Sequence, residues 1–156
     1  MIGITQKIFL ALGAIFTAMF GFSGCVDKPD VPPEQEVTTM YITIEGNKAE
    51  VTLEQNAATA ALVELLRNGD ITYTADDYGG FEKVGGLGHS LPTSNSQITT
   101  RPGDVILYSG NQIVLFYGSN SWSYTRLGKI NGYSTDELKT LFAAGAGRVE
   151  VTLSLN

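Results

Sequence analysis

Eight side chains between residues 78 and 126 have the chemical types that line pockets for small molecules. The aromatic candidates are Tyr78, Phe81, Trp122 and Tyr124, and the polar candidates are Glu82, His89, Asn111 and Arg126. Aromatic rings offer apolar surface to a ligand, and a few charged or amide groups fix its orientation. Ser and Asn residues surround Trp122, which is typical of surfaces that make adaptable contacts. The sequence predicts a ligand pocket from these residues, and the alternative is that the rings simply fill the core.

No catalytic or phosphate-binding motif accompanies these candidates. Gly80 and Gly85 have the spacing of a phosphate-binding loop, but Gly86 stands where that loop needs a Lys. The pair His89-Ser90 lacks the G-x-S-x-G turn that exposes a nucleophilic Ser. Its two side chains would also point to opposite faces of an extended segment. We therefore expect no catalytic residue and no cofactor.

Composition excludes several further classes of site and partner. The chain has one Cys and one His, which excludes an intramolecular disulfide and a Cys-cluster zinc site. The pair Asp76-Asp77 lacks the spaced oxygen ligands of an EF-type calcium loop. Ten Lys and Arg residues against sixteen Asp and Glu residues give a net charge of -6, which disfavours nucleic acid as a partner. We expect no metal and no nucleic acid, and the sequence leaves the oligomeric state open.

The first 24 residues have the pattern of a secretory signal peptide. Between Ile8 and Phe22 the only polar side chain is Thr17, and this apolar run is shorter than the ~20 residues that a membrane-spanning helix needs. The run ends in Phe22-Ser23-Gly24-Cys25, which resembles the lipobox of bacterial lipoproteins, with Phe22 in place of the usual Leu. The resemblance implies that Cys25 is lipidated and anchors the protein to a membrane of the bacterial cell envelope. The alternatives are cleavage at another site and an uncleaved anchor.

An acidic, Pro-rich segment follows Cys25. Asp27–Glu36 reads DKPDVPPEQE, a composition that cannot bury enough apolar surface to fold. In the polyproline form, at ~3.1 Å per residue, it would span about 30 Å. We predict a signal peptide over residues 1–24, a lipidated Cys and disordered tether over 25–38, and one folded domain over 39–156.

The alternation of apolar and polar residues predicts that the folded domain is mainly β. Met40 to Leu53 alternates around a turn at Gly46-Asn47, which indicates a hairpin with one buried face. Asn56 and Ser134 have the pattern of helix starts. The other predicted strands are 71–74, 105–108, 113–117, 122–130 and 149–155, and the Gly-rich passage 76–92 contains no long element. About eight short strands with two helices favour a small barrel, since closure removes exposed strand edges.

The order of these segments resembles the bacterial cyclophilin-like fold protein family. The similarity rests on Asp77–Lys83 (DYGGFEK), Leu91-Pro92-Thr93, Gly103–Tyr108 (GDVILY), Ile113–Tyr117 (IVLFY) and Leu127-Gly128 before Lys129-Ile130. It covers residues 40–155 and implies a small, closed, eight-stranded β-barrel with two helices. The activity of that family is largely undefined, so the resemblance implies a fold more than a function.

The sequence leaves more than one function open. In the first hypothesis, the envelope-anchored barrel binds a small ligand, a peptide or a glycan and has no catalytic set. In the second, it is a weak peptidyl-prolyl cis-trans isomerase that acts on envelope proteins. True cyclophilins place an Arg over a hydrophobic pocket, but this chain lacks their Phe-His-Arg run and their Gln-Gly-Gly-Asp segment. Arg101 and Arg126 are the available substitutes. A third hypothesis is an accessory subunit whose barrel surface contacts other proteins.

Overall fold

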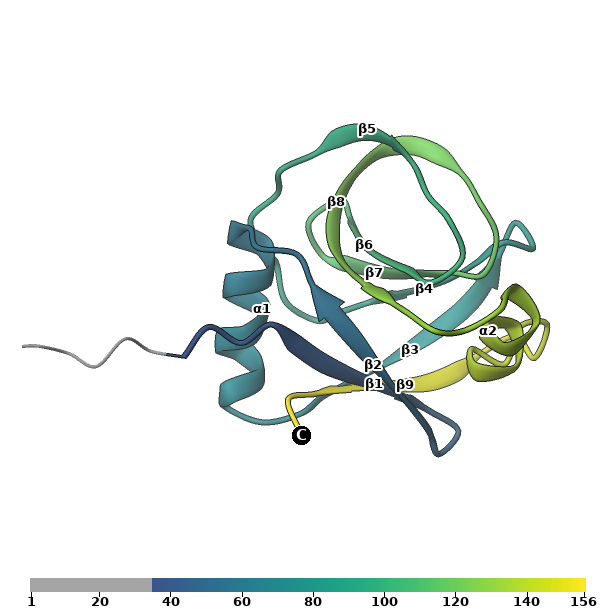
Figure 1. Ribbon diagram of the computed structural model, residues 1–156, viewed down its shortest axis with the longest axis horizontal. Coiled ribbons are helices and arrows are strands. Elements are labelled where there is room, and N and C mark those ends of the chain that lie inside the picture. The colour runs from purple at the N-terminus through teal and green to yellow at the C-terminus, as the bar shows by residue number, and fades with distance from the viewer. Residues whose placement is uncertain (1–34) are drawn as a thin grey trace, which may run out of the picture. The chain divides into compact units, whose positions relative to one another are not determined.

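The chain from Thr39 to Ser154 forms nine strands and two helices in the computed structural model, which describes residues 35–156 (Figure 1). The elements in chain order are β1 (Thr39–Ile44), β2 (Asn47–Leu53), α1 (Ala57–Arg67), β3 (Ile71–Tyr78), β4 (Glu82–Gly86), β5 (Ser96–Thr99), β6 (Asp104–Tyr108), β7 (Gln112–Phe116), β8 (Ser121–Ile130), α2 (Thr135–Leu141) and β9 (Val149–Ser154). The predicted signal peptide, Cys25 and most of the predicted tether lie outside the described residues. Within residues 35–156, no helix is long and apolar enough to cross a membrane.

Eight of the strands close into an antiparallel barrel. Hydrogen-bonded neighbours follow the order β2-β1-β9-β3-β4-β7-β6-β8, and β8 pairs with β2 to complete the ring. The closing seam aligns Val51 with Ile130 and Leu53 with Gly128. The ninth strand, β5, pairs with the start of β8 and is not part of the ring. The closed eight-stranded barrel with two helices is therefore confirmed, and the structure adds one strand to it.

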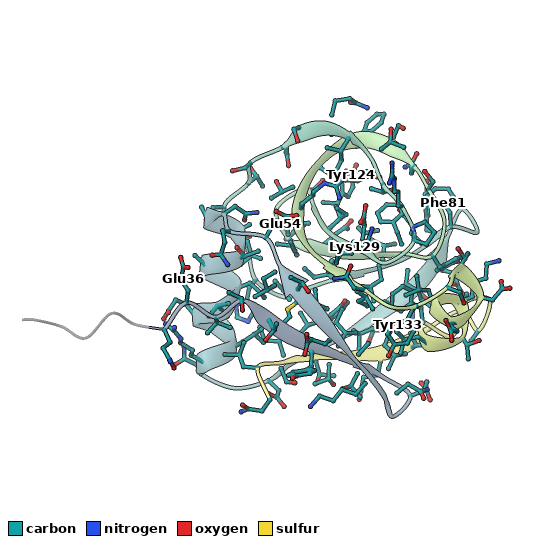
Figure 2. The ribbon with its side chains drawn as sticks, in the orientation of Figure 1. Glu36, Glu54, Phe81, Tyr124, Lys129 and Tyr133 are labelled. Carbon is teal, nitrogen blue, oxygen red and sulfur yellow. The ribbon has the colours of Figure 1, made fainter. Side chains whose placement is uncertain are left out.

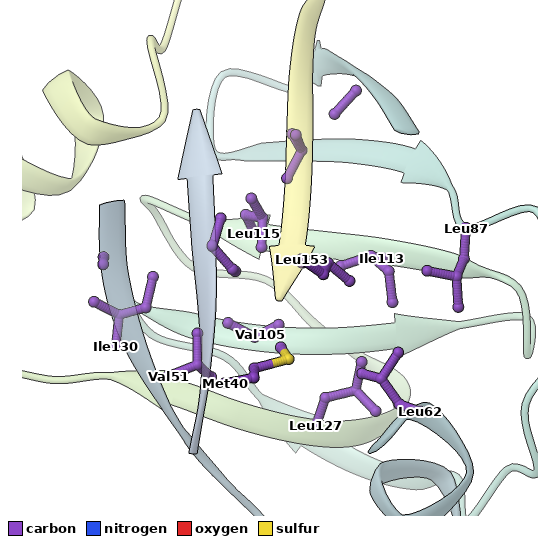
Figure 3. Close-up of a cluster of buried hydrophobic side chains, with 14 of the residues drawn as sticks. Met40, Val51, Leu62, Leu87, Val105, Ile113, Leu115, Leu127, Ile130 and Leu153 are labelled. Atoms are coloured by element: carbon purple, nitrogen blue, oxygen red, sulfur yellow. The ribbon is translucent and has the colours of Figure 1, made fainter. Parts of the chain in front are cut away.

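Side chains that alternate along the strands fill the barrel interior. Met40 and Val51 are fully buried there, together with Leu153 from the last strand (Figure 3). Leu62 of α1 belongs to the same cluster, so this helix covers part of the barrel (Figure 3). Burying one such side chain contributes roughly 1.5–3 kcal/mol. The alternation in the sequence therefore determines which face of each strand points inward.

Both helices begin at the predicted capping residues. Oδ1 of Asn56 accepts a hydrogen bond from the backbone N–H of Thr59 at 3.0 Å, and Oγ1 of Thr59 accepts one from the N–H of Asn56 at 3.1 Å. The side chains of Ser134 and Glu137 make the same reciprocal pair at α2. These contacts satisfy backbone donors that the first helical turn leaves free. Local sequence is therefore sufficient to place both helix starts.

Strands β6 and β7 are apolar on both faces because each face packs into a separate apolar cluster. The inward side chains, such as Val105, belong to the main core. The outward side chains Ile106, Val114 and Phe116 form a second cluster with Tyr124 of β8. This cluster exists because β8 curves over the outer face of β6, β7 and β4, with β5 along its edge (Figure 1). A bulge at Val105/Ile106 in the pairing with β8 accompanies the bend.

The sequence pattern did not predict two of the strands, and a third strand is longer than predicted. β4 lies in the Gly-rich passage, where a Cβ on Gly85 would lie under 3.0 Å from the backbone oxygen of Thr74. The glycine that hides this strand in the sequence is thus required by the close approach of β3. β5 is short and mostly exposed, so it has no alternation to detect. β3 continues to Tyr78 instead of ending at Thr74, because β4 extends its pairing.

Candidate ligand-binding site

A cavity of about 630 Å³ opens on the outer face of the barrel. Its lining residues come from β3, β4, β6, β7 and the start of β8, and we call it the outer pocket. They are Thr74, Asp76, Tyr78, Glu82, Val84, Gly85, Gly86, Tyr108, Gln112, Val114, Asn120, Trp122 and Tyr124. Val114 and Tyr124 also belong to the second apolar cluster. The outer pocket therefore exists because β8 bends over the barrel wall and does not lie flat beside it.

Four of the eight predicted ligand residues line the outer pocket: Tyr78, Glu82, Trp122 and Tyr124. Tyr78 and Trp122 are 63% and 56% exposed, whereas Tyr124 is buried. Phe81 is not a lining residue, but its ring packs against Tyr78 beside the pocket. Phe81 and Tyr124 both lie on the side of the barrel that β8 covers (Figure 2). The alternative that all these rings fill the barrel interior is wrong for Tyr78 and Trp122.

The other three predicted residues do not reach the outer pocket. His89 is exposed in the bend that follows β4. Asn111 is exposed in the turn between β6 and β7, where its carbonyl oxygen accepts a hydrogen bond from the N–H of Leu87 at 2.9 Å. The guanidinium group of Arg126 donates to Oδ2 of Asp104 at 3.0 Å. A position near the predicted loops therefore did not distinguish these three residues from the four that line the pocket.

A continuous run of aromatic rings supports the pocket. The ring of Tyr78 meets Phe81 edge to face, and Phe81 stacks on Phe116, with 6.3 Å between centroids in each pair. Phe116 meets Tyr124 at 5.8 Å, and Tyr124 meets Tyr108 at 6.0 Å. Offset and edge-to-face pairs of this kind add stability beyond the area that they bury. The five rings therefore form a continuous aromatic wall, of which Tyr78, Tyr108 and Tyr124 line the cavity.

Glu82 places a carboxyl group beside this wall. It pairs with Phe116 across β4 and β7 and is 7% exposed. Its Oε2 atom is buried and has no hydrogen-bond partner among the described residues. Burial raises the pKa of Glu82 from its ordinary value of 4.5 to about 7, because the charged form loses its hydration. Near neutral pH the carboxyl group therefore exists in both forms and can donate or accept a hydrogen bond.

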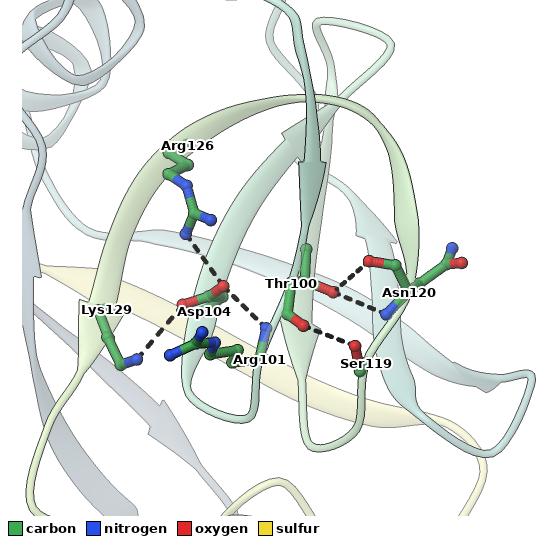
Figure 4. A network of polar contacts seen from close by, with 7 residues as sticks. All are labelled: Thr100, Arg101, Asp104, Ser119, Asn120, Arg126 and Lys129. Carbon is green, nitrogen blue, oxygen red and sulfur yellow. Dashed lines mark hydrogen bonds and ion pairs between the residues drawn. The ribbon is translucent and has the colours of Figure 1, made fainter.

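Asn120 holds the rim of the pocket where β8 begins. Its side-chain Nδ2 donates to the hydroxyl oxygen of Tyr124 at 2.9 Å. Its carbonyl oxygen accepts hydrogen bonds from the N–H and the hydroxyl of Thr100, and Ser119 donates to the carbonyl oxygen of Thr100 (Figure 4). Thr100 is fully buried, so this network is fixed to the barrel. The start of β8 is thus positioned by polar contacts that hold its ring-bearing residues over the cavity.

Sequence reasoning did not identify Tyr108, Gln112 and Asn120 as lining residues. Tyr108 and Gln112 pair across β6 and β7 at the end of the hairpin. The predicted strand 105–108 contains Tyr108, whereas Gln112 lies one residue before the predicted strand 113–117. Side chains on one face of a strand recur every second residue, so Tyr108 shares a face with Ile106 and Gln112 shares one with Val114. Asn120 lies in the Ser- and Asn-rich stretch before Trp122. None of the three could be assigned to the pocket before the bend of β8 was known.

A partly buried ion pair lies on the face of β4 opposite to Glu82. Lys83, the neighbour of Glu82 in β4, points inward and is fully buried. Its Nζ atom lies 2.9 Å from Oδ2 of Asp77 and donates to the carbonyl oxygen of Gly147 at 2.6 Å. Burial by itself would raise the pKa of Asp77. Hydrogen bonds from Lys83, Gly147 and Tyr117 outweigh that effect and hold the pKa of this carboxyl group below its ordinary value. The pair ties β4 to the loop before β9.

Comparison with known proteins assigns the fold to a family. Residues 42–154 match the model of the cyclophilin-like family. The chain belongs to that family. The cyclophilin-like barrel is also similar to the solution structure of the hypothetical protein AF2241 from Archaeoglobus fulgidus, with a TM-score of 0.59 and 19% sequence identity over 80% of this chain and 99% of that chain. That likeness concerns the fold alone, and no curated protein matches the chain.

Arg101 and Arg126 of this cyclophilin-like barrel do not line the outer pocket. Asp104 is buried and accepts hydrogen bonds from Arg126 and from the backbone N–H of Arg101 (Figure 4). Lys129 lies 3.8 Å from the other carboxylate oxygen of Asp104. Among the described residues, no Arg, Lys or His lines the pocket, and no group of three His, Cys, Asp or Glu side chains is arranged to hold a metal ion. The lining therefore offers aromatic, amide and carboxyl groups.

Proposed function

We propose that this protein binds a small organic ligand in the outer pocket. The observation that carries the proposal is the position of its exposed aromatic rings. Four large hydrophobic side chains are exposed among the described residues, and Tyr78, Tyr108 and Trp122 all line this pocket. Burying large rings contributes much of the energy of folding and binding, and exposed clusters of them mark interaction sites. The fourth exposed ring, Tyr133, lies elsewhere.

The size of the cavity supports a small ligand. Its volume of about 630 Å³ lies within the roughly 300–1,000 Å³ of typical small-molecule sites. Gln112, Asn120 and Asp76 supply polar groups at the rim that would orient a ligand. A short peptide or one end of a glycan would engage the same aromatic surface, so both belong in the test.

Trp122 provides a direct readout of binding. It is the only Trp in the chain, and it lines the pocket, so its fluorescence reports on ligands there. We would screen small cations, anions, neutral molecules, short peptides and oligosaccharides for saturable changes in Trp122 emission. We expect at least one class to bind. If no class changes the emission, the proposal is overturned.

A variant that fills the pocket provides the control. A Cβ on Gly86 would meet no atom within 4 Å, and Gly86 lines the pocket. We therefore expect Gly86→Phe to fold and to weaken binding at least tenfold by occupying the cavity. The matched control is Gly132→Ala, outside the pocket, which should leave binding unchanged even if it lowers stability. Equal binding by Gly86→Phe and the parent protein would place the ligand elsewhere.

We further propose that the barrel is presented from a lipid anchor at Cys25 on a membrane of the bacterial cell envelope. The support is the apolar leader that ends in small residues directly before the single Cys. Metabolic labelling with a fatty-acid analogue tests the anchor. We expect labelling of the parent protein and none of Cys25→Ser. Equal labelling of both proteins would overturn the anchor while leaving the pocket proposal intact.

A further inference from the structure

The charged groups that line the outer pocket are all acidic. Two carboxyl groups, Asp76 and Glu82, line it, and no basic side chain does so among the described residues. Asp76 already has a partner, since Nε and Nη2 of Arg148 each lie 3.3 Å from its Oδ2 atom. The Oε2 atom of Glu82 has no hydrogen-bond partner within residues 35–156. Glu82 is therefore the lining carboxyl group that a ligand could compensate with a donor or a positive charge.

A buried carboxyl oxygen without a donor is unfavourable, because it has lost its water and gained no replacement. A ligand that brings a hydrogen-bond donor to Oε2 would remove this penalty. If that donor also carries a positive charge, it would compensate the ionised form of Glu82, and charge-assisted hydrogen bonds are about twice as strong as neutral ones. A ligand anion would meet two acids and no base.

The aromatic surroundings favour the same charge. Tyr78, Tyr108, Trp122 and Tyr124 line the pocket with Glu82. The face of an aromatic ring carries negative electrostatic potential and attracts an ammonium group within about 6 Å of its centroid, most strongly for Trp. The rings also bury the apolar part of a ligand. A cation with an apolar body would thus use both features of the lining.

We infer that the ligand of the outer pocket is a protonated organic amine with at least one N–H and an apolar group, and that Glu82 is its counter-ion. This inference rests on the proposed ligand-binding function and specifies its ligand class. The N–H matters because a quaternary ammonium group cannot donate to Oε2. The aromatic rings alone would accept either kind of cation.

Binding of such an amine would displace the proton of Glu82. Burial raises the pKa of Glu82 to about 7 in the free protein, and a neighbouring cation would lower that pKa. The ionisable groups that line the pocket with Glu82 are Asp76 and Tyr78 of β3, Tyr108 of β6 and Tyr124 of β8, and Arg148 is paired with Asp76. Tyr117, after β7, also interacts electrostatically with Glu82. At about pH 6 the amine should therefore release close to one proton from the full chain, whereas release should be small at about pH 8.5.

Four matched probes test the ligand class on the purified full chain. They are 2-phenylethylammonium, its trimethylammonium analogue, 2-phenylethanol and 3-phenylpropanoate, each titrated against Trp122 emission. We expect the primary ammonium to bind at least tenfold more tightly than each of the other three. Glu82→Gln should weaken its binding at least tenfold at about pH 8, and the exposed control Glu54→Gln should not.

Calorimetry in buffers of different ionisation enthalpy measures proton release in the parent protein, so the test does not depend on the folding of a variant. Tighter or equal binding of the alcohol or the carboxylate, or no proton release at about pH 6, would overturn the amine inference while the pocket proposal stood. Equal binding of the trimethylammonium analogue would overturn the role of the N–H. If none of the four probes and no compound of the wider screen changes Trp122 emission, both proposals fail.

Discussion

At the scale of single residues, Glu82 makes the free energy of unfolding depend on pH in an unusual direction. Its pKa is about 7 in the fold against 4.5 ordinarily, so the fold favours the protonated form. The stability that this group contributes is fully present below about pH 4.5 and is lost as the pH rises through 7. The difference between the two pKa values corresponds to at most roughly 3 kcal/mol.

We predict that Glu82→Gln stabilises the protein at high pH and has little effect at low pH. The amide stays neutral, so at about pH 8.5 the variant avoids burying a charge and should gain up to about 3 kcal/mol in the free energy of unfolding. Near pH 4.5 the two proteins should differ by less than about 1 kcal/mol. Urea denaturation at both pH values measures this, with Glu54→Gln as the control. The same change at both pH values would show that Glu82 is not a buried acid.

The ion pair of Lys83 and Asp77 is the second feature at this scale. Replacing either residue should lower the free energy of unfolding, but by different amounts. Asp77→Ala leaves the fully buried Lys83 cation with a hydrogen bond to the carbonyl oxygen of Gly147 but without its carboxylate partner. An uncompensated buried charge costs about 3–5 kcal/mol. Lys83→Met leaves Asp77 with hydrogen bonds from Tyr117, Gly145 and Gly147. The expected loss in the free energy of unfolding is therefore about 1–3 kcal/mol.

Urea denaturation of both variants and of the double variant checks that prediction. The double variant should be more stable than Asp77→Ala, because it removes the unpaired charge. Asp77 has a lowered pKa, so its contribution is present above the ordinary Asp range and is lost as the pH falls through the lowered value. The gap between Asp77→Ala and the parent protein should therefore narrow in acid. A larger cost for Lys83→Met than for Asp77→Ala would contradict this account.

At the scale of elements, the seam between β2 and β8 decides whether the barrel closes. A Cβ on Gly128 would lie under 3.0 Å from the backbone oxygen of Thr52 and from a side-chain carbon of Val51. Neither atom belongs to a flexible side-chain end. We predict that Gly128→Ala costs about 1–3 kcal/mol or more by forcing the two strands apart.

Thermal and urea unfolding measure that loss, and Gly86→Ala is the matched control. Gly86 also lies in a strand, but an added Cβ there would meet no atom within 4 Å. Its variant should change the free energy of unfolding by less than about 0.5 kcal/mol. If both variants behave alike, the close approach of β2 and β8 does not limit closure.

At the scale of the whole molecule, residues 35–156 should fold without the preceding segment. They form a separate compact unit and contain the complete ring of strands and the main core. We predict that a recombinant fragment of these residues unfolds in one cooperative transition, with an unfolding enthalpy near 0.7 kcal/mol per residue around 60 °C. Calorimetry measures both the cooperativity and the enthalpy of this transition. A broad transition without a heat peak would show that the unit depends on residues outside it.

The local features of this protein were predictable from its sequence, because their causes lie within a few residues. Alternation from Met40 to Leu53 determined the first hairpin, and side chains three residues apart determined both helix starts. The resemblance in segment order also gave the barrel correctly. The sequence did not reveal β4, because Gly85 interrupts its apolar pattern. Gly85 is needed for the close approach of β3, a contact that local sequence does not show.

The pocket was predictable only in part. Tyr78, Glu82, Trp122 and Tyr124 were recognisable by chemical type, but His89, Asn111 and Arg126 had equally suitable chemistry and lie elsewhere. The tertiary structure decided between them, because the bend of β8 over β4 and β7 selects which side chains share one cavity. The isolation of Oε2 of Glu82 also depends on that bend. Burial and the lack of a partner are properties of the assembled wall, whereas the type of each side chain is a property of the sequence.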